Sequence, residues 1–197
     1  RVKRVNEFHN VEVNLLQSAA MVDPAGRFGM TFFSGFRYFR YREDFDYMGT
    51  MAGAEFFQND FTTQAGYQIK AKNHLIGWQI GSRGHLYLGE KFRLYAVPRV
   101  GIFVNNISQY QELCMVINMH SRKTDLALMG QLDLGMSYQL FRCCSIFGGY
   151  RAMGIAGVAN ADDNIPISFM SQPDMAQINS SGSIILHGAQ AGIQFQF

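Results

Sequence analysis

Apolar and polar residues alternate with a period of two along much of this 197-residue chain. Successive side chains of a β-strand point to opposite faces, so the alternation predicts strands with one apolar and one polar face. The clearest case is residues 125–140, whose even positions are apolar apart from one glycine: Leu126, Leu128, Gly130, Leu132, Leu134, Met136, Tyr138 and Leu140. The odd positions carry the hydrophilic residues of the segment, among them Gln131, Asp133 and Gln139.

Six further segments predict strands by the same pattern, at residues 11–15, 28–38, 67–88, 91–104, 144–157 and 185–197. The longer strands run to about 14 to 20 residues, whereas strands of soluble proteins usually run to about 5 or 6. A membrane-spanning strand needs roughly 9 to 11 residues for the hydrocarbon region. Strand length therefore favours the membrane. Pro98 is an exception to the pattern, because proline removes a ladder donor and prefers an edge strand or a bulge.

The predicted connections fall into two classes. Short or medium connections lie at residues 89–90, 141–142 and 21–26, and long ones at residues 43–66, 109–123 and 158–180. Short periplasmic turns opposite long external loops are typical of outer-membrane barrels. The predicted fold is therefore all-β, an antiparallel transmembrane β-barrel with long strands.

The strand count predicts how much of the barrel the chain supplies. Bacterial barrels have an even number of strands, and seven are found here. We therefore expect residues 1–197 to be a single β-barrel domain that lacks one or more N-terminal strands of the complete protein. Alternatively, residues 43–66 contribute strand extensions that the pattern does not resolve.

Composition excludes several other classes of protein. Charged residues make up only 16% of the chain, and the formal net charge is +2 with scattered basic residues, so no nucleic-acid partner is expected. No apolar run of about 18 residues is present, which excludes a transmembrane helix. The three cysteines are odd in number and two are adjacent, which disfavours a disulfide framework; they are Cys114, Cys143 and Cys144.

Five stretches resemble the β-barrel porin family 7 of planctomycete bacteria. They are FSGFRYFRY at residues 33–41, NHLIGWQIG at 73–81, GQLDLG at 130–135, GYRAMGIAGVA at 149–159 and GSIILHG at 182–188. The resemblance implies an outer-membrane barrel in the cell envelope, of which this chain is the C-terminal portion. It also implies that the barrel-assembly machinery reads the final strand at Phe197. The chain has fewer acidic loop residues than that family, which leaves its ion preference open.

The polar parity of the strands gives the candidate pore-lining residues. These are Arg37, Arg83, Arg99, Arg151, Asp133, Gln131 and Gln79, with Glu12 on the same face. In an aqueous lumen, rings of charged side chains set ion selectivity, and an excess of arginine favours anions. In a small barrel the interior is just wide enough for side chains, so the same charges would pair and stabilise the wall.

Aromatic residues on the apolar parity are candidates for a girdle at the bilayer boundaries, where a ring is half buried and half wet. They are Phe36, Tyr38, Tyr41, Trp78, Tyr138, Phe195 and Phe197. In a soluble β protein the same residues would form the core. The apolar stretch at residues 113–119, in a predicted external loop, is expected to fold into the lumen or to contact a neighbour.

No motif predicts catalysis or a cofactor. The sequence has no nucleophile elbow, metal-binding pair or phosphate loop, and its five histidines lie far apart, so we expect neither an enzyme nor a metal site. Residues 160–164 contain two aspartates that suit a calcium ion, but they lack the EF-hand spacing, and an ordinary polar loop is the alternative.

Three hypotheses for the function follow. The first is porin-like passive diffusion of small solutes or ions across the bacterial outer membrane. The second is a structural scaffold with a filled lumen, whose loops and tail at residues 1–6 hold a surface layer, a partner or further copies of the chain. The third is a soluble β-sandwich or lipid-binding barrel, in which the apolar parity would point inward. Outer-membrane lipid is a partner in the first two.

Overall fold

The computed structural model describes residues 1–16, 21–23, 26–50, 64–113, 117–141, 143–166 and 176–195. Its sheet is an antiparallel meander in which each long strand pairs with the next one along the chain. The strands are β1 (Val2–Leu16), β3 (Phe28–Thr50), β4 (Gln64–Leu88), β5 (Phe92–Leu113), β6 (Ile117–Phe141), β7 (Cys144–Val158) and β8 (Gly182–Phe195). A two-residue strand, β2 (Met21–Val22), pairs with the start of β3, and a 3-10 turn, η1 (Asp162–Asn164), follows β7.

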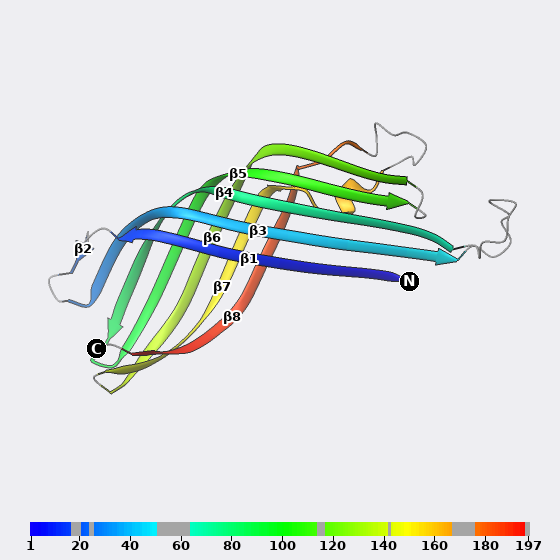
Figure 1. Ribbon diagram of the computed structural model, residues 1–197. Coiled ribbons are helices and arrows are strands. Elements are labelled where there is room, and N and C mark those ends of the chain that lie inside the picture. The colour runs from blue at the N-terminus through cyan, green and yellow to red at the C-terminus, as the bar shows by residue number, and fades with distance from the viewer. Residues whose placement is uncertain are drawn as a thin grey trace, which may run out of the picture.

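The sheet curls into half a barrel, with β1 and β8 at its two edges (Figure 1). Among the described residues, β1 pairs only with β3 and β8 pairs only with β7. The all-β, antiparallel part of the prediction is thus confirmed, and the described sheet is open along one side. No helix in the described part of the chain is long and apolar enough to cross a membrane.

Two predicted long loops are wrong, because the strands extend further than the sequence pattern indicated. Residues 43–50 continue β3 and residues 64–66 begin β4, so the alternative of strand extensions there is correct. Residues 109–113 end β5, and residues 117–123 begin β6. Cross-strand pairs such as Tyr47 with Tyr67 stabilise these extensions. The predicted tail at residues 1–6 is also wrong, since β1 begins at Val2.

Pro98 lies inside β5, a central strand, where a proline is unusual. The β4–β5 pairing omits Ser82 and Arg83, which stand opposite Pro98 and Val97. The β5–β6 pairing is continuous at the same position, with Pro98 opposite Leu132. The missing N–H of the proline is therefore accommodated by a local break in one ladder.

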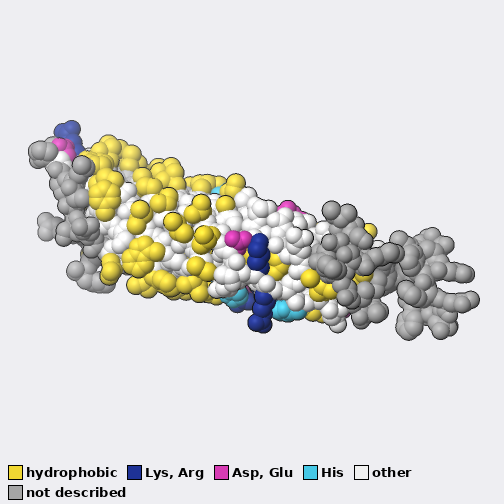
Figure 2. Space-filling model, turned by 90° about the horizontal axis from the view of Figure 1, so that it is seen from above, with side chains coloured by type: hydrophobic (Ala, Val, Ile, Leu, Met, Phe, Trp, Pro, Cys, Tyr) yellow, Lys and Arg dark blue, Asp and Glu magenta, His cyan; other side chains and the backbone are white. Residues whose placement is uncertain are grey.

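The outer face of the sheet carries a continuous apolar band. Its side chains are exposed, as the 66% exposed fraction of Leu126 and 63% of Ile102 show. The band ends at one register row across five strands, formed by Val11, Tyr38, Ile76, Val104 and Leu126. The next outward row is polar and consists of His9, Arg40, His74, Asn106 and Thr124. Figure 2 shows hydrophobic side chains over one half of the molecule and charged ones just past their border.

The inner face has the opposite distribution. Around the border of the band, and further toward the β3–β4 connection, it holds a buried apolar cluster. The members of this cluster are Phe39, Tyr41, Leu75, Phe103, Ala127, Met129, Met153, Ile155 and Val158. At the level of the band itself, inward side chains such as Arg37, Gln79 and Asp133 are polar and buried. The predicted outward direction of the apolar parity therefore holds within the band, and the direction reverses beyond it.

Candidate functional site

Asp133 is the centre of an ionic network on the inner face. Its carboxylate accepts hydrogen bonds from Arg151 on the adjacent strand β7, with distances of 2.7 and 3.0 Å from Nε and Nη2. Arg99 of β5 donates through Nη1 at 2.6 Å, and Gln131 donates at 3.0 Å. The Asp133 side chain is only 3% exposed, so one buried anion is shared by two guanidinium groups. Charge-assisted hydrogen bonds of this kind are among the strongest in proteins.

Arg37 organises a second polar group next to the first. Its Nε donates to Asn10 Oδ1 at 2.7 Å, and its Nη1 donates to Gln79 Oε1 at 3.2 Å. Gln79 in turn donates through Nε2 to Glu12 Oε2 and to Asn14 Oδ1, both at 2.8 Å. Together the two groups contain three arginines and two carboxylates, so this part of the inner wall carries an excess of positive charge.

Six of the seven predicted pore-lining residues therefore meet in these two groups: Arg37, Gln79, Arg99, Gln131, Asp133 and Arg151. The seventh, Arg83, has the same strand parity, but its side chain is exposed beside the break in the β4–β5 ladder. Whether these side chains line a water-filled pore stays a prediction.

On the inner wall, an aromatic ring of β3 packs directly against a glycine of the neighbouring strand β4. The ring of Phe33 lies over Gly81 so closely that a Cβ on Gly81 would overlap it. The guanidinium of Arg99 stands 5.7 Å from the centre of the same ring. This packing explains why Phe33 interrupts the apolar and polar alternation of β3: it is an inward residue, 6% exposed.

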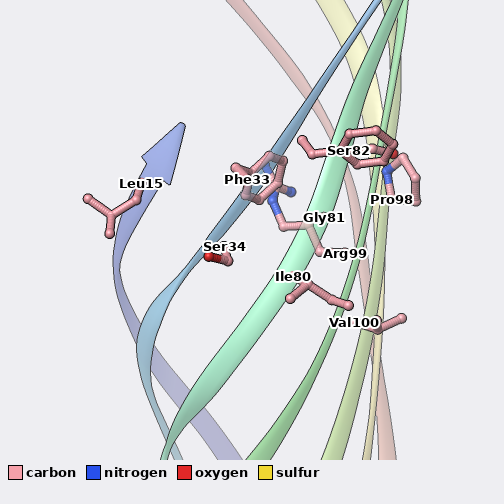
Figure 3. A pocket seen from close by; sticks show the side chains of 10 residues that line it. Leu15, Phe33, Ser34, Ile80, Gly81, Ser82, Pro98, Arg99 and Val100 are labelled. Atoms are coloured by element: carbon pink, nitrogen blue, oxygen red, sulfur yellow. The ribbon is translucent and has the colours of Figure 1, made fainter. Parts of the chain in front are cut away.

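A pocket of about 580 Å³ lies over strands β1, β3, β4 and β5 (Figure 3). Most of its lining residues have outward parity, including Leu15, Ser34, Ile80 and Val100, and Figure 3 shows Phe33 and Arg99 close together beside them. Arg99 is the only titratable residue in the lining, and its guanidinium is engaged with Asp133. The pocket is a depression in the apolar band.

The β7–β8 connection folds into the half-barrel beyond the border of the apolar band, on the side where β3 ends and β4 begins. We call Val158 at the end of β7 and the described residues 159–166 and 176–181 that follow it the inserted loop. Gly157, with φ of +88°, adopts a conformation that favours glycine, beside a bulge in the β7–β8 pairing. The following residues Val158, Ala159 and Ala161 are fully buried. The loop therefore occupies the interior at this height.

Polar side chains of three different strands hold the inserted loop. Asn73 of β4 donates to the carbonyl of Ala159 and accepts from its amide, both at 2.9 Å. Glu43 of β3 accepts from the amide of Ala161 at 2.8 Å. Asn105 of β5 donates to the carbonyl of Gly157 at 2.9 Å. All three side chains are fully buried, so each contact satisfies a polar group that has no access to water.

Residues 160–164 are tied to the loop and the wall by their own side chains. Asn164 donates to the carbonyl of Asn160 at 2.7 Å and accepts from the amide of Asn179 at 2.6 Å. Asp163 accepts from Asn160 at 2.9 Å, and Asp162 lies 3.6 Å from Arg4. No group of three metal-ligating side chains occurs in the described residues. Asp162 and Asp163 each have a partner within the protein.

Glu43, Asn73 and Asn105 were not among the site residues predicted from the sequence. A signal was present, because all three share the inward parity of Arg37, Gln79 and Arg99 on their own strands.

Burial raises the pKa of the Tyr41 hydroxyl to about 12, mainly by desolvation and also through the charge of Glu43. Tyr41 was predicted in the girdle and is instead inside, 3% exposed, because its odd position faces inward.

The other predicted girdle residues that the structure describes lie on the outer face. Tyr38 stands in the last apolar row and bonds His74 Nδ1 through its hydroxyl at 2.8 Å, with Phe36 and Trp78 one row further into the band. Tyr138 and Phe195 lie near the short turns at the opposite end. Phe197 and Cys114 are outside the described residues, while Cys143 and Cys144 are free thiols.

No known family model matches the sequence, and a search of curated proteins finds no match to it.

Replacing Asn73 with alanine is expected to release the inserted loop. The change leaves the amide and carbonyl of Ala159 without partners inside the protein, at a cost of about 1–3 kcal/mol for each buried unsatisfied group. Limited proteolysis should then cut within residues 158–181 faster than in the wild type. Asn106→Ala, on the outer face of β5, is the matched control and should leave the cleavage rate unchanged. Equal cleavage of both variants would show that Asn73 does not hold the loop.

Proposed function

We propose that this chain forms part of the wall of a bacterial outer-membrane β-barrel that lets small solutes pass by passive diffusion. The observation that carries the proposal is the exposed apolar band, which ends along a single register row across five strands. On β5 the band covers residues 92–104, and a strand rises about 3.4 Å per residue. At a tilt of about 40° this gives a height of about 30 Å, close to the hydrocarbon thickness of a bilayer.

The polar inner wall supports diffusion of solutes over a purely structural role. A wall built only for stability needs no excess of charge, whereas the network around Asp133 and Arg37 holds more arginines than carboxylates. An excess of fixed cations in a narrow lumen favours anions. The resemblance to porin family 7 supports the same proposal, and outer-membrane lipid and the barrel-assembly machinery are the partners that it implies.

A structural scaffold is the second candidate, and the inserted loop favours it. Loop residues 158–161 are buried, and so are the inward side chains beside them on β3, β4 and β5, among them Phe39, Leu75 and Ile107. A barrel filled in this way would transmit no solute unless the loop moved. Under this alternative, loops at the same end of the barrel would hold a surface layer, a partner or further copies of the chain.

Conductance of the purified full-length protein in planar bilayers tests the proposal. We expect discrete channel steps with a preference for anions, and larger steps in Asn73→Ala, because that change frees the loop. Stable insertion without any steps, in the wild type and in Asn73→Ala alike, would favour the scaffold. Failure of the protein to float with phosphatidylcholine vesicles after an alkaline wash would contradict the membrane location itself.

A further inference from the structure

A cluster of cations lies on the outer face immediately beyond the apolar band. The first polar row contains Arg40 and His74, and the second contains Arg42, Lys72 and Arg122. Arg42 and Lys72 are register partners on neighbouring strands, which lie about 4.8 Å apart in a sheet. Glu7, at the β1 end of the second row, is the one carboxylate that these two described rows contain.

The positive charge of this cluster is largely unbalanced. Arg42 is engaged by Asp44, at 2.9 and 2.6 Å, and Glu7 is hydrogen-bonded to His9 at 2.7 Å. Arg40, Lys72 and Arg122 make no ion pair with a carboxylate in the part of the chain that the structure describes. Like charges held side by side repel one another unless an anion lies between them.

Two further observations place Arg40 and Lys72 together at the border of the band. The Nε of Arg40 is buried and has no hydrogen-bond partner among the described residues, which is costly for a charged group. The pKa of the His74 imidazole is lowered by partial burial and by the charges of Arg40 and Lys72. Burial and these charges therefore favour the neutral form of His74 beside Tyr38, and an unsatisfied guanidinium donor stands next to it.

We propose that Arg40 and Lys72, with Arg122 nearby, bind the phosphate of a lipid headgroup at the upper edge of the band. The proposal rests on the proposed function, since the lipid must lie against the barrel wall. Tyr38, Ile76 and Val104 form the last apolar row directly below the cations. A lipid whose acyl chains cover these residues has its phosphate at the height of Arg40 and Lys72, whereas free phosphate gains nothing from the apolar row.

The probe is a fluorescent phosphatidic acid, titrated into the full-length protein in neutral detergent micelles. Each basic residue near an anionic lipid surface contributes about fivefold in affinity, so Arg40→Gln with Lys72→Gln should weaken binding roughly 10- to 30-fold. Arg27→Gln with Lys91→Gln removes two exposed cations at the opposite end of the band and should change binding less than about twofold. Diacylglycerol with the same chains should bind much more weakly than phosphatidic acid.

Each contrary result has a distinct meaning. Equal binding by both double variants, or equal affinity for diacylglycerol, would overturn the cation site. Competition by inorganic phosphate at the same concentration as the lipid would overturn the lipid source. Flotation of the wild type with phosphatidylcholine vesicles is measured in parallel: insertion without phosphatidic acid binding refutes this site alone, whereas failure to insert refutes the proposed function and the lipid site together.

Discussion

Replacement of Asp133 with asparagine is expected to lower the free energy of unfolding by about 3 kcal/mol or more. Removing one partner of a buried ion pair leaves the other charge without compensation, which typically costs about 3–5 kcal/mol. Here Asp133 balances both Arg99 and Arg151, and the Arg99 side chain is only 10% exposed. The half-exposed Arg151 contributes less, because water screens its charge.

Urea unfolding in detergent, followed by the fluorescence of the single tryptophan, Trp78, measures this change. Glu90→Gln is the matched control, since it removes a carboxylate from the exposed β4–β5 turn and should leave the midpoint unchanged. Asp133→Asn should also raise the anion preference of any conductance. An unchanged unfolding midpoint for Asp133→Asn would mean that the two arginines do not depend on this carboxylate.

Replacement of Val100 with arginine is expected to destabilise the protein in a lipid bilayer by about 2–4 kcal/mol, the usual cost of a charge near the midplane on the lipid face of a barrel. Val100 is 58% exposed near the middle of the band on β5. At so exposed a position in a water-soluble protein, the same substitution changes stability by about 0.5 kcal/mol or less. The size of the effect therefore separates a lipid-facing surface from a wet one.

The control is Ser108→Arg, on the same strand and the same face but beyond the border of the band. We expect it to alter the free energy of unfolding in phosphatidylcholine vesicles by less than about 0.5 kcal/mol. If Val100→Arg is as mild as Ser108→Arg, the apolar band does not face lipid.

The outer band was predictable because a period of two needs no long-range information. Each outward residue between Leu126 and Leu140 follows from its position in the strand. The same logic failed at residues 43–50, where Glu43, Asp44 and Asp46 look like a charged loop. In the structure Glu43 points inward and Asp44 outward, so the charges are divided between two faces.

The candidate site was only half predictable, for a related reason. Arg99, Asp133 and Arg151 lie on strands adjacent in sequence, so their common parity was enough to group them. Besides Arg4, Glu43 has a partner in the amide of Ala161, which is 118 residues away and presents no side-chain signal. Contacts between a side chain and a distant backbone group leave no pattern in either local segment.

The directions of the two edge strands determine how this sheet could be closed into a full barrel. In a meander of seven long antiparallel strands, β1 and β8 necessarily point the same way. A direct pairing of β8 with β1 would therefore be parallel. A second copy of the chain in the same orientation would also present only edge strands that run in this direction. To close the barrel with antiparallel pairs alone, one further strand that runs in the opposite direction is required, or an odd number of further strands in alternating directions.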